Sequence, residues 1–482
     1  MLNGKLILLL QTLSKKELKD FRSFVATDYH NPNRHLEKFI GLLAKYEDDF
    51  SNPKLEKEVF FKKHYPGEKF DEQKIRYLQS DLTKLLEEFI SYTEFRKDRF
   101  QQQLYLTQSM QRRNVTKYFL QELEELDKLN ETASFRDSDY YLKLHKISEI
   151  RYEYSSENRN RAFDNSLQEL IDNLEITYLA RGFRYYCEMI NRRNILSVTY
   201  NLSFFDELVQ YLRKGTFDDI PAIYIYRLIH CTLTEPDEIH HYTNLLEALK
   251  KHEHLFSRNE ARGMYVFAQN FCIRRINSGD KDALGMIFSL YQEMVDKHLI
   301  FEGNFVSQPD FKNIVTTGLR LGEDEWVGNF IEEFYPKLNP QFAKNAYTYS
   351  MAWVHFARKE HDKALRMLLK VEFNDVYYHL DSKSLLMKVY FELDEYDAFA
   401  SLVDAFKIYL RRNQTISEIQ KKTYHNFILL INKLMKFKLN RSAPSAAFME
   451  ELEKLRPAAD IPWLRNRAEG LEQKFGKAQK QS

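Results

Sequence analysis

The side chains that could bind a metal or attack a substrate form no recognisable site in this sequence. The histidine-rich stretch EIHHYTNLLEALKKHEHLF places His252 and His254 two residues apart. That spacing puts them on different sides of a helix, and no HExxH follows. The motifs GxxxxGK[ST], GxGxxG and GxSxG do not occur either. We therefore expect a non-enzymatic protein without metal or cofactor, and rank an enzyme with no recognisable motif third among the hypotheses.

Arginines interleaved with aromatic rings suggest a different chemistry. FRKDRFQQQLYLTQSMQRRNVTKYF and RGFRYYCEMINRRN are rich in both residue types. Basic side chains can grip phosphates while rings stack on bases, and the residues that would do so are Arg112, Arg113, Arg192 and Arg193. This alternative requires the four arginines to converge on one exposed face. Solvated helix faces explain the same composition, and pairing with acids such as Glu188 would favour that explanation.

The elements that carry these residues are predicted to be helices. The chain has 14 glycines and 11 prolines, and neither type occurs between Gly67 and Gly182. Such a stretch suits long helices joined by short polar turns. Spacings of three and four place one set of apolar residues on a single helix face: Ile75, Leu78, Leu82, Leu85, Phe89 and Tyr92. Ser14 and Glu17 have capping-box spacing, which predicts the start of another helix. The fold class is all-α.

Bulk properties restrict the location of the protein and its partners. The 482 residues carry a formal net charge of +1, so no global field draws the chain to nucleic acid or anionic lipid. Cys187, Cys231 and Cys272 are scattered, as expected for reduced thiols. The apolar run Leu6 to Leu10 is too short for a secretory signal, and no stretch approaches the roughly 20 apolar residues of a membrane span. We expect a cytoplasmic protein.

A loose phrase recurs in the C-terminal half. KEHDKALRMLLKV begins at Lys359, and similar acidic-aromatic phrases begin at Asp324 and Asp394. A period near 35 residues is typical of stacked helix-turn-helix units. FARKEHDKALRML resembles the junction between paired helices in the tetratricopeptide repeat family, with Ala364 as the small residue where the helices touch. The resemblance covers residues 321–411, and prolines expected at the repeat ends are missing.

The resemblance implies a right-handed α-solenoid of antiparallel helix hairpins whose inner groove binds a protein or peptide segment. Carried over by position, the groove residues are Tyr349, Trp353, Ser384 and Lys388. Core packing is the competing interpretation of Trp353. The predicted domains are an N-terminal helical unit (1–100), a hairpin array (101–440), and a linker with a basic helical tail (441–482) that folds back or meets an acidic partner. The leading hypothesis is a protein-binding scaffold.

Overall fold

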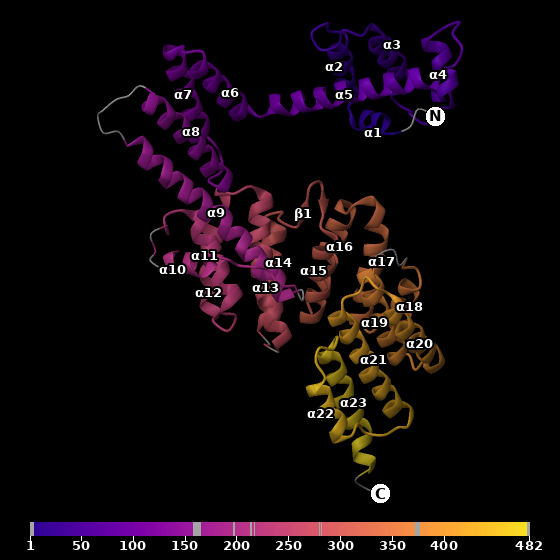
Figure 1. Cartoon of the computed structure of the whole chain (residues 1–482). Helices are drawn as coiled ribbons and strands as arrows, with labels where there is room; N and C mark the ends of the chain where they lie inside the picture. Colours follow the sequence, from indigo (N-terminus) through magenta and orange to yellow (C-terminus); the bar gives the residue numbers. More distant parts are fainter. Residues whose placement is uncertain are drawn as a thin grey trace. The chain divides into compact units, whose positions relative to one another are not determined.

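The chain is almost entirely helical, which confirms the all-α prediction. A computed structural model describes residues 4–157, 165–195, 198–212, 215, 217–278, 280, 282–371 and 376–479. These residues form 23 α-helices and one two-stranded hairpin, β1 (Phe301–Glu302) with β2 (Phe305–Val306). Figure 1 shows the helices in chain order. The chain divides into two compact units, Met1–Arg181 and Gly182–Ser482, and each is described by itself.

The first unit contains two separate hydrophobic cores. One core extends from Leu6 to Phe89, and the other begins at Phe100 and ends at Ile150. The break between them lies between Phe89 and Phe100, inside the first compact unit. The helices of the first core are α1 (Lys5–Thr12), α2 (Lys15–Val25), α3 (Arg34–Leu43), α4 (Lys57–His64) and α5 (Glu72–Lys97). Those that follow are α6 (Arg99–Arg112), α7 (Thr116–Glu131), α8 (Ser138–Glu157) and α9 (Ser166–Ile195), the last of which continues into the second unit.

Local sequence accounts for the helix starts and faces in this unit. Ser14 and Glu17 form the expected capping box, in which the Ser14 N–H donates to Glu17 Oε2 at 2.8 Å. Along α5 the predicted apolar stripe is correct as far as Leu82 and again at Phe89. Between them Leu86 takes the buried position expected for Leu85, because alternating spacings of three and four average 3.5 residues, slightly less than the 3.6 residues of a helical turn.

Beyond α9, the second unit is a succession of α-helices that range from 8 to 22 residues. Its first helices are α10 (Phe205–Leu212), α11 (Pro221–Thr234), α12 (Ile239–His252), α13 (Arg258–Ser278) and α14 (Ala283–Asp296). After the β-hairpin follow α15 (Gln308–Leu321), α16 (Asp324–Phe334), α17 (Pro340–Ala357), α18 (His361–Leu368), α19 (Val376–Glu392) and α20 (Tyr396–Arg412). The last are α21 (Glu418–Leu439), α22 (Ala446–Lys454) and α23 (Ile461–Gln479). Most helices contact the next one in the chain, and α17 also contacts both α15 and α19.

The turns between paired helices share one backbone geometry. Lys359 and Asp394 both adopt left-handed backbone conformations, with φ of 61° and 60°. The N–H that follows each donates to the carbonyl five residues earlier, at 2.8 and 3.1 Å, as in a Schellman motif. These two turns lie 35 residues apart, the spacing of the repeated phrase. The preceding turn has the same geometry at Gly322, which lies 37 residues before Lys359. The turns at Gly322 and Lys359 are therefore two residues farther apart than the 35-residue period of the repeated phrase.

The helices from α17 to α23 share one hydrophobic core. Ala364 is fully buried in it, in agreement with the contact position expected from the sequence. Leu452 and Leu464 belong to the same core, so the segment described as a tail packs on the preceding helices. Ion pairs from Arg467 to Glu392 (2.6 Å) and from Lys438 to Asp394 (2.6 Å) reinforce the packing. The basic C-terminal segment therefore folds back on the chain itself.

Candidate partner-binding surface

The four residues expected to line a peptide groove meet, but inside the protein. Tyr349 and Trp353 lie on α17, and Ser384 and Lys388 lie on α19. The Lys388 ammonium is 4.6 Å from the centre of the Trp353 ring. However, Tyr349, Ser384 and Lys388 are 1%, 6% and 2% exposed, and Trp353 is half-buried. These side chains are core residues in this structure, because the C-terminal helices cover the face that the resemblance left open.

The buried ammonium of Lys388 is stabilised by its surroundings. Trp463 and Phe356 add rings 5.8 and 6.0 Å away, and Asp460 forms an ion pair with the nitrogen. A buried cation is tolerated only where a partner charge and ring faces replace its water. Asp460 immediately precedes α23 in a left-handed backbone conformation (φ 49°). Lys388 thus anchors the start of the last helix.

The four arginines of the nucleic-acid hypothesis fall into two pairs that belong to different compact units. All four side chains are exposed, with Arg112 and Arg113 at the end of α6 and Arg192 and Arg193 near the end of α9. No common face is assigned to them. The Arg192 Nε lies 2.7 Å from Glu188 Oε1, and this hydrogen bond raises the pKa of Arg192. Pairing with Glu188 is the arrangement that weakens a role for Arg192 in phosphate binding.

A row of exposed apolar side chains on α9 is the most unusual surface feature of the first unit. Leu167, Ile171, Leu174 and Tyr178 are 56%, 51%, 44% and 45% exposed. Their spacing of four, three and four places them on one face of the helix. We call these four residues the α9 stripe. Contiguous apolar side chains exposed on one helix face can mark an interaction site.

The rest of α9 in this unit explains why the stripe is left uncovered. The Asn173 Nδ2 donates to Ser148 Oγ on α8 at 2.8 Å, and Thr177 is buried. These positions define the face that packs on α8. The stripe lies on a different side of α9, so its four apolar side chains remain outside the contact with α8. A helix of that kind needs a second neighbour to remove its remaining apolar surface from water.

Polar and acidic side chains border the α9 stripe. The Gln168 Nε2 donates to Asp172 Oδ1 at 2.7 Å, and Glu175 follows Leu174 in half-buried surroundings. Within the described ranges of the first unit, neither Asp172 nor Glu175 has a Lys or Arg ion-pair partner. This edge can therefore attract a basic group from outside. The sequence carried a signal for the stripe, since SLQELIDNLEITYLARG has more apolar residues than one buried face needs. The binding residues predicted from the sequence did not include the stripe.

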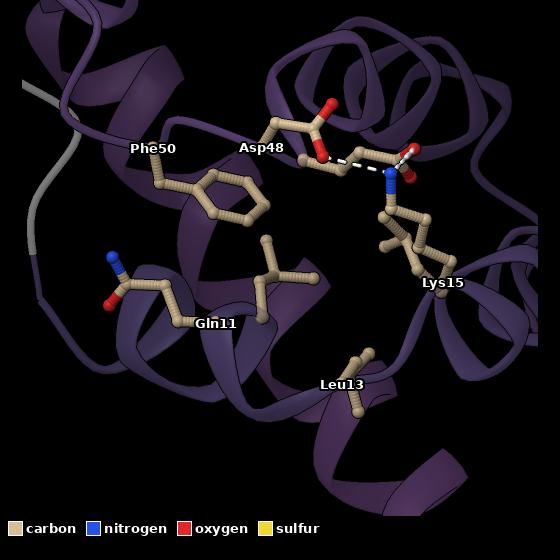
Figure 2. A pocket seen from close by; sticks show the side chains of 8 residues that line it. Gln11, Leu13, Lys15, Asp48 and Phe50 are labelled. Atoms are coloured by element: carbon tan, nitrogen blue, oxygen red, sulfur yellow. Dashed lines mark ion pairs between the residues drawn. The ribbon is translucent and has the colours of Figure 1, made fainter.

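Two surface depressions in the N-terminal helices do not have the properties of small-molecule sites. Figure 2 shows the first, a cavity of about 140 Å³ beside Leu13 and Phe50, where Lys15 Nζ lies 2.9 Å from Asp48 Oδ1. That hydrogen bond raises the pKa of Lys15. The volume is below the roughly 300–1,000 Å³ of ligand pockets. The second, of about 550 Å³, is lined mainly by charged side chains, among them Lys19, Arg22 and Glu37.

In the part of the chain that the structure describes, no three His, Cys, Asp or Glu side chains are grouped to hold a metal ion. No described helix combines the length and apolar character needed to cross a membrane. Comparisons with protein-family models, curated proteins and solved structures find no match for this chain.

Proposed function

We propose that this protein is a non-enzymatic helical scaffold that binds another protein. Support comes from the succession of helix hairpins and from the turn geometry that recurs at Gly322, Lys359 and Asp394. A right-handed, tetratricopeptide-like α-solenoid is the architecture that best fits this recurrence, since each hairpin buries its apolar face by stacking on the next. Scaffolds of this kind act in binding rather than in chemistry.

The observation that carries the proposal is the α9 stripe. Its residues recur at i, i+4, i+7 and i+11, which is the pattern by which two amphipathic helices pack together. Leu167 and Ile171 can fit between side chains of a partner helix, and Tyr178 can keep its hydroxyl at the solvent edge. The acidic border at Asp172 and Glu175 favours lysine or arginine beside the partner's apolar face. The occupant is therefore a basic amphipathic helix of a partner protein.

Site-specific photo-crosslinking tests this occupant directly. A photoreactive phenylalanine analogue at position 178 should capture a partner segment in cell extract, and sequencing of the crosslinked peptide should show a basic amphipathic helix. The same analogue at Tyr29, which is 88% exposed in the same unit, is the matched control. Capture of the same peptide at both positions would contradict the proposal. Capture of a second copy of this chain would show that the α9 stripe is a homodimer interface and would contradict binding of a different protein.

A substitution in the α9 stripe measures its contribution to binding. Leu174→Asp should weaken binding of the captured peptide by about 10- to 100-fold. The change removes a leucine whose burial under the partner helix is worth about 1.5–3 kcal/mol, and it adds a negative charge to the acidic border. Leu439→Asp introduces the same change at a position 57% exposed in the second unit and should leave affinity unchanged. Circular dichroism should show unchanged helix content in both variants.

A further inference from the structure

The solvent face of α6 combines basic side chains with exposed rings. Its buried side is formed by Phe100, Leu104 and Thr107. Residues half a turn away from these on a helix point to solvent. The residues on that solvent side, together with those that begin α7, are Arg99, Tyr105, Arg112, Arg113, Lys117 and Tyr118, and all are exposed. We call them the α6 strip.

The positive charges of the α6 strip are available to a ligand. Among the residues that the structure describes, no carboxylate forms an ion pair with Arg99, Arg112, Arg113 or Lys117, and Arg113 Nε donates only to Ser109 Oγ at 3.2 Å. Some other arginines of this unit are paired with a carboxylate, as Arg151 is with Asp127 at 2.7 Å. Unpaired neighbouring cations repel one another, and an anionic ligand relieves that repulsion.

The rings of the α6 strip are placed for stacking. Tyr105 and Tyr118 are 53% and 52% exposed, which is more than a ring needs to place its hydroxyl in water. The Tyr105 ring lies 5.9 Å from that of Phe95 and is supported there on one side. Lys117 Nζ is 6.0 Å from the centre of the Tyr118 ring, so a cation accompanies this ring as well. Ring faces next to cations suit bases next to phosphates.

We propose that the α6 strip binds single-stranded nucleic acid. The helix has 14 residues and is about 21 Å long at 1.5 Å per residue. A stacked strand places one phosphate about every 3.4 Å, so several nucleotides fit along it. An acidic peptide would use the arginines but would gain little from Tyr105 and Tyr118. This site uses Arg112 and Arg113 without Arg192 or Arg193, and it is independent of the α9 stripe.

Fluorescence anisotropy with a labelled 20-nucleotide oligo(dT) and the full chain tests the proposal. Binding at 50 mM salt should weaken as salt rises, with a log–log slope of about −0.7 for each phosphate contacted. The double variant Arg112→Gln with Arg113→Gln should reduce the magnitude of the slope by about 1.4. With equal affinities of the two proteins at 1 M salt, the variant should bind about 60-fold more weakly than the wild type at 50 mM salt. Lys54→Gln with Lys62→Gln removes the same charge at two exposed positions elsewhere in the unit and should have little effect.

The contribution of base stacking is tested separately. Tyr105→Ala should weaken binding by about 5- to 150-fold without changing the salt slope, the range expected for loss of one stacked base. Tyr105→Phe retains the ring and should restore binding. Absence of oligo(dT) binding at 50 mM salt would overturn the proposal, as would equal losses in the arginine and lysine double variants. The proposal would also be overturned if polyglutamate bound through the arginines and if loss of the Tyr105 ring changed neither polyglutamate nor oligo(dT) binding. Those results would identify a site for acidic polymers instead.

Discussion

Replacing Gly318 by alanine should destabilise the second unit, although alanine is the better helix former. Gly318 lies in α15, and a methyl group built on it would lie 2.4 Å from Val327 Cγ2 and 2.9 Å from Phe288 Cε2. Both neighbours are buried core side chains on the adjacent helices α16 and α14. Val327 cannot turn away easily, because a β-branched side chain in a helix has one strongly preferred rotamer. The helices themselves would have to separate.

The expected size of the effect follows from two opposing terms. Alanine gains about 1 kcal/mol over glycine in a helix interior. Overpacking a core costs about 1–3 kcal/mol, and two contacts below 3.0 Å place this site near the upper end. The net loss for Gly318→Ala should be about 2 kcal/mol. Gly328 lies in the paired helix α16 with no atom within 4 Å of a built methyl group. Gly328→Ala should therefore stabilise by up to about 1 kcal/mol.

Urea denaturation followed by tryptophan fluorescence measures this difference. The three tryptophans all lie in the second unit, and Trp326 contacts Phe288 with ring centres 5.1 Å apart. With an m value of about 3 kcal/mol/M, Gly318→Ala should lower the midpoint by about 0.7 M. Stabilisation of Gly318→Ala to the same extent as Gly328→Ala would refute the close packing. Adding Val327→Ala should cost less in the Gly318→Ala background than alone, since the two changes share one contact.

Three further outcomes follow from buried groups. Ala364→Leu should cost about 1–3 kcal/mol by overpacking, and an unchanged urea midpoint would show open space at that helix contact. Trp353→Ala should lower the free energy of unfolding by about 3 kcal/mol, because the ring packs on the core and covers the Lys388 ammonium. Circular dichroism in urea measures this loss. Unchanged stability would show that Trp353 is not a core residue and would make it a candidate for partner binding again. Burial, with the positive charge of Lys38, lowers the pKa of His64 to about 4 from 6.5, so the unfolded chain binds more protons between these values. Stability of the N-terminal helices should therefore fall by roughly 3 kcal/mol as pH decreases from 6.5 to 4, as followed by tyrosine near-ultraviolet circular dichroism, and His64→Leu should abolish that dependence.

Local sequence was a good guide to the helices because their determinants are local. The capping box at Ser14 and Glu17 depends on four residues, and its signal is contained within them. The burial of Ala364 was predictable for a similar reason, since a small residue at a helix junction leaves room only for another helix. The 37-residue spacing before Lys359 was not predictable, because α16 continues into a 3-10 turn at Tyr335–Lys337 before α17 begins.

The candidate site depended on distant contacts and was not predicted. Whether Lys388 faces a groove or a core is decided by Asp460 and Trp463, which come more than 70 residues later. Periodicity shows that Lys388 shares a face with Ser384 but not what covers that face. The α9 stripe was missed for the complementary reason. Its residues look like core in a sequence, and only the packing of α8 shows that Leu167 and Tyr178 remain exposed.

The pairing of Lys388 with Asp460 has a consequence for the order of folding during synthesis. The two residues are 72 positions apart. At 5–20 residues per second a ribosome needs about 4 to 14 s to extend the chain from one to the other. During that interval the ammonium and the Trp353 ring have no cover from the last helix. The N-terminal helices can fold early, whereas the core from α17 to α23 can close only after Asp460 and Leu464 have emerged.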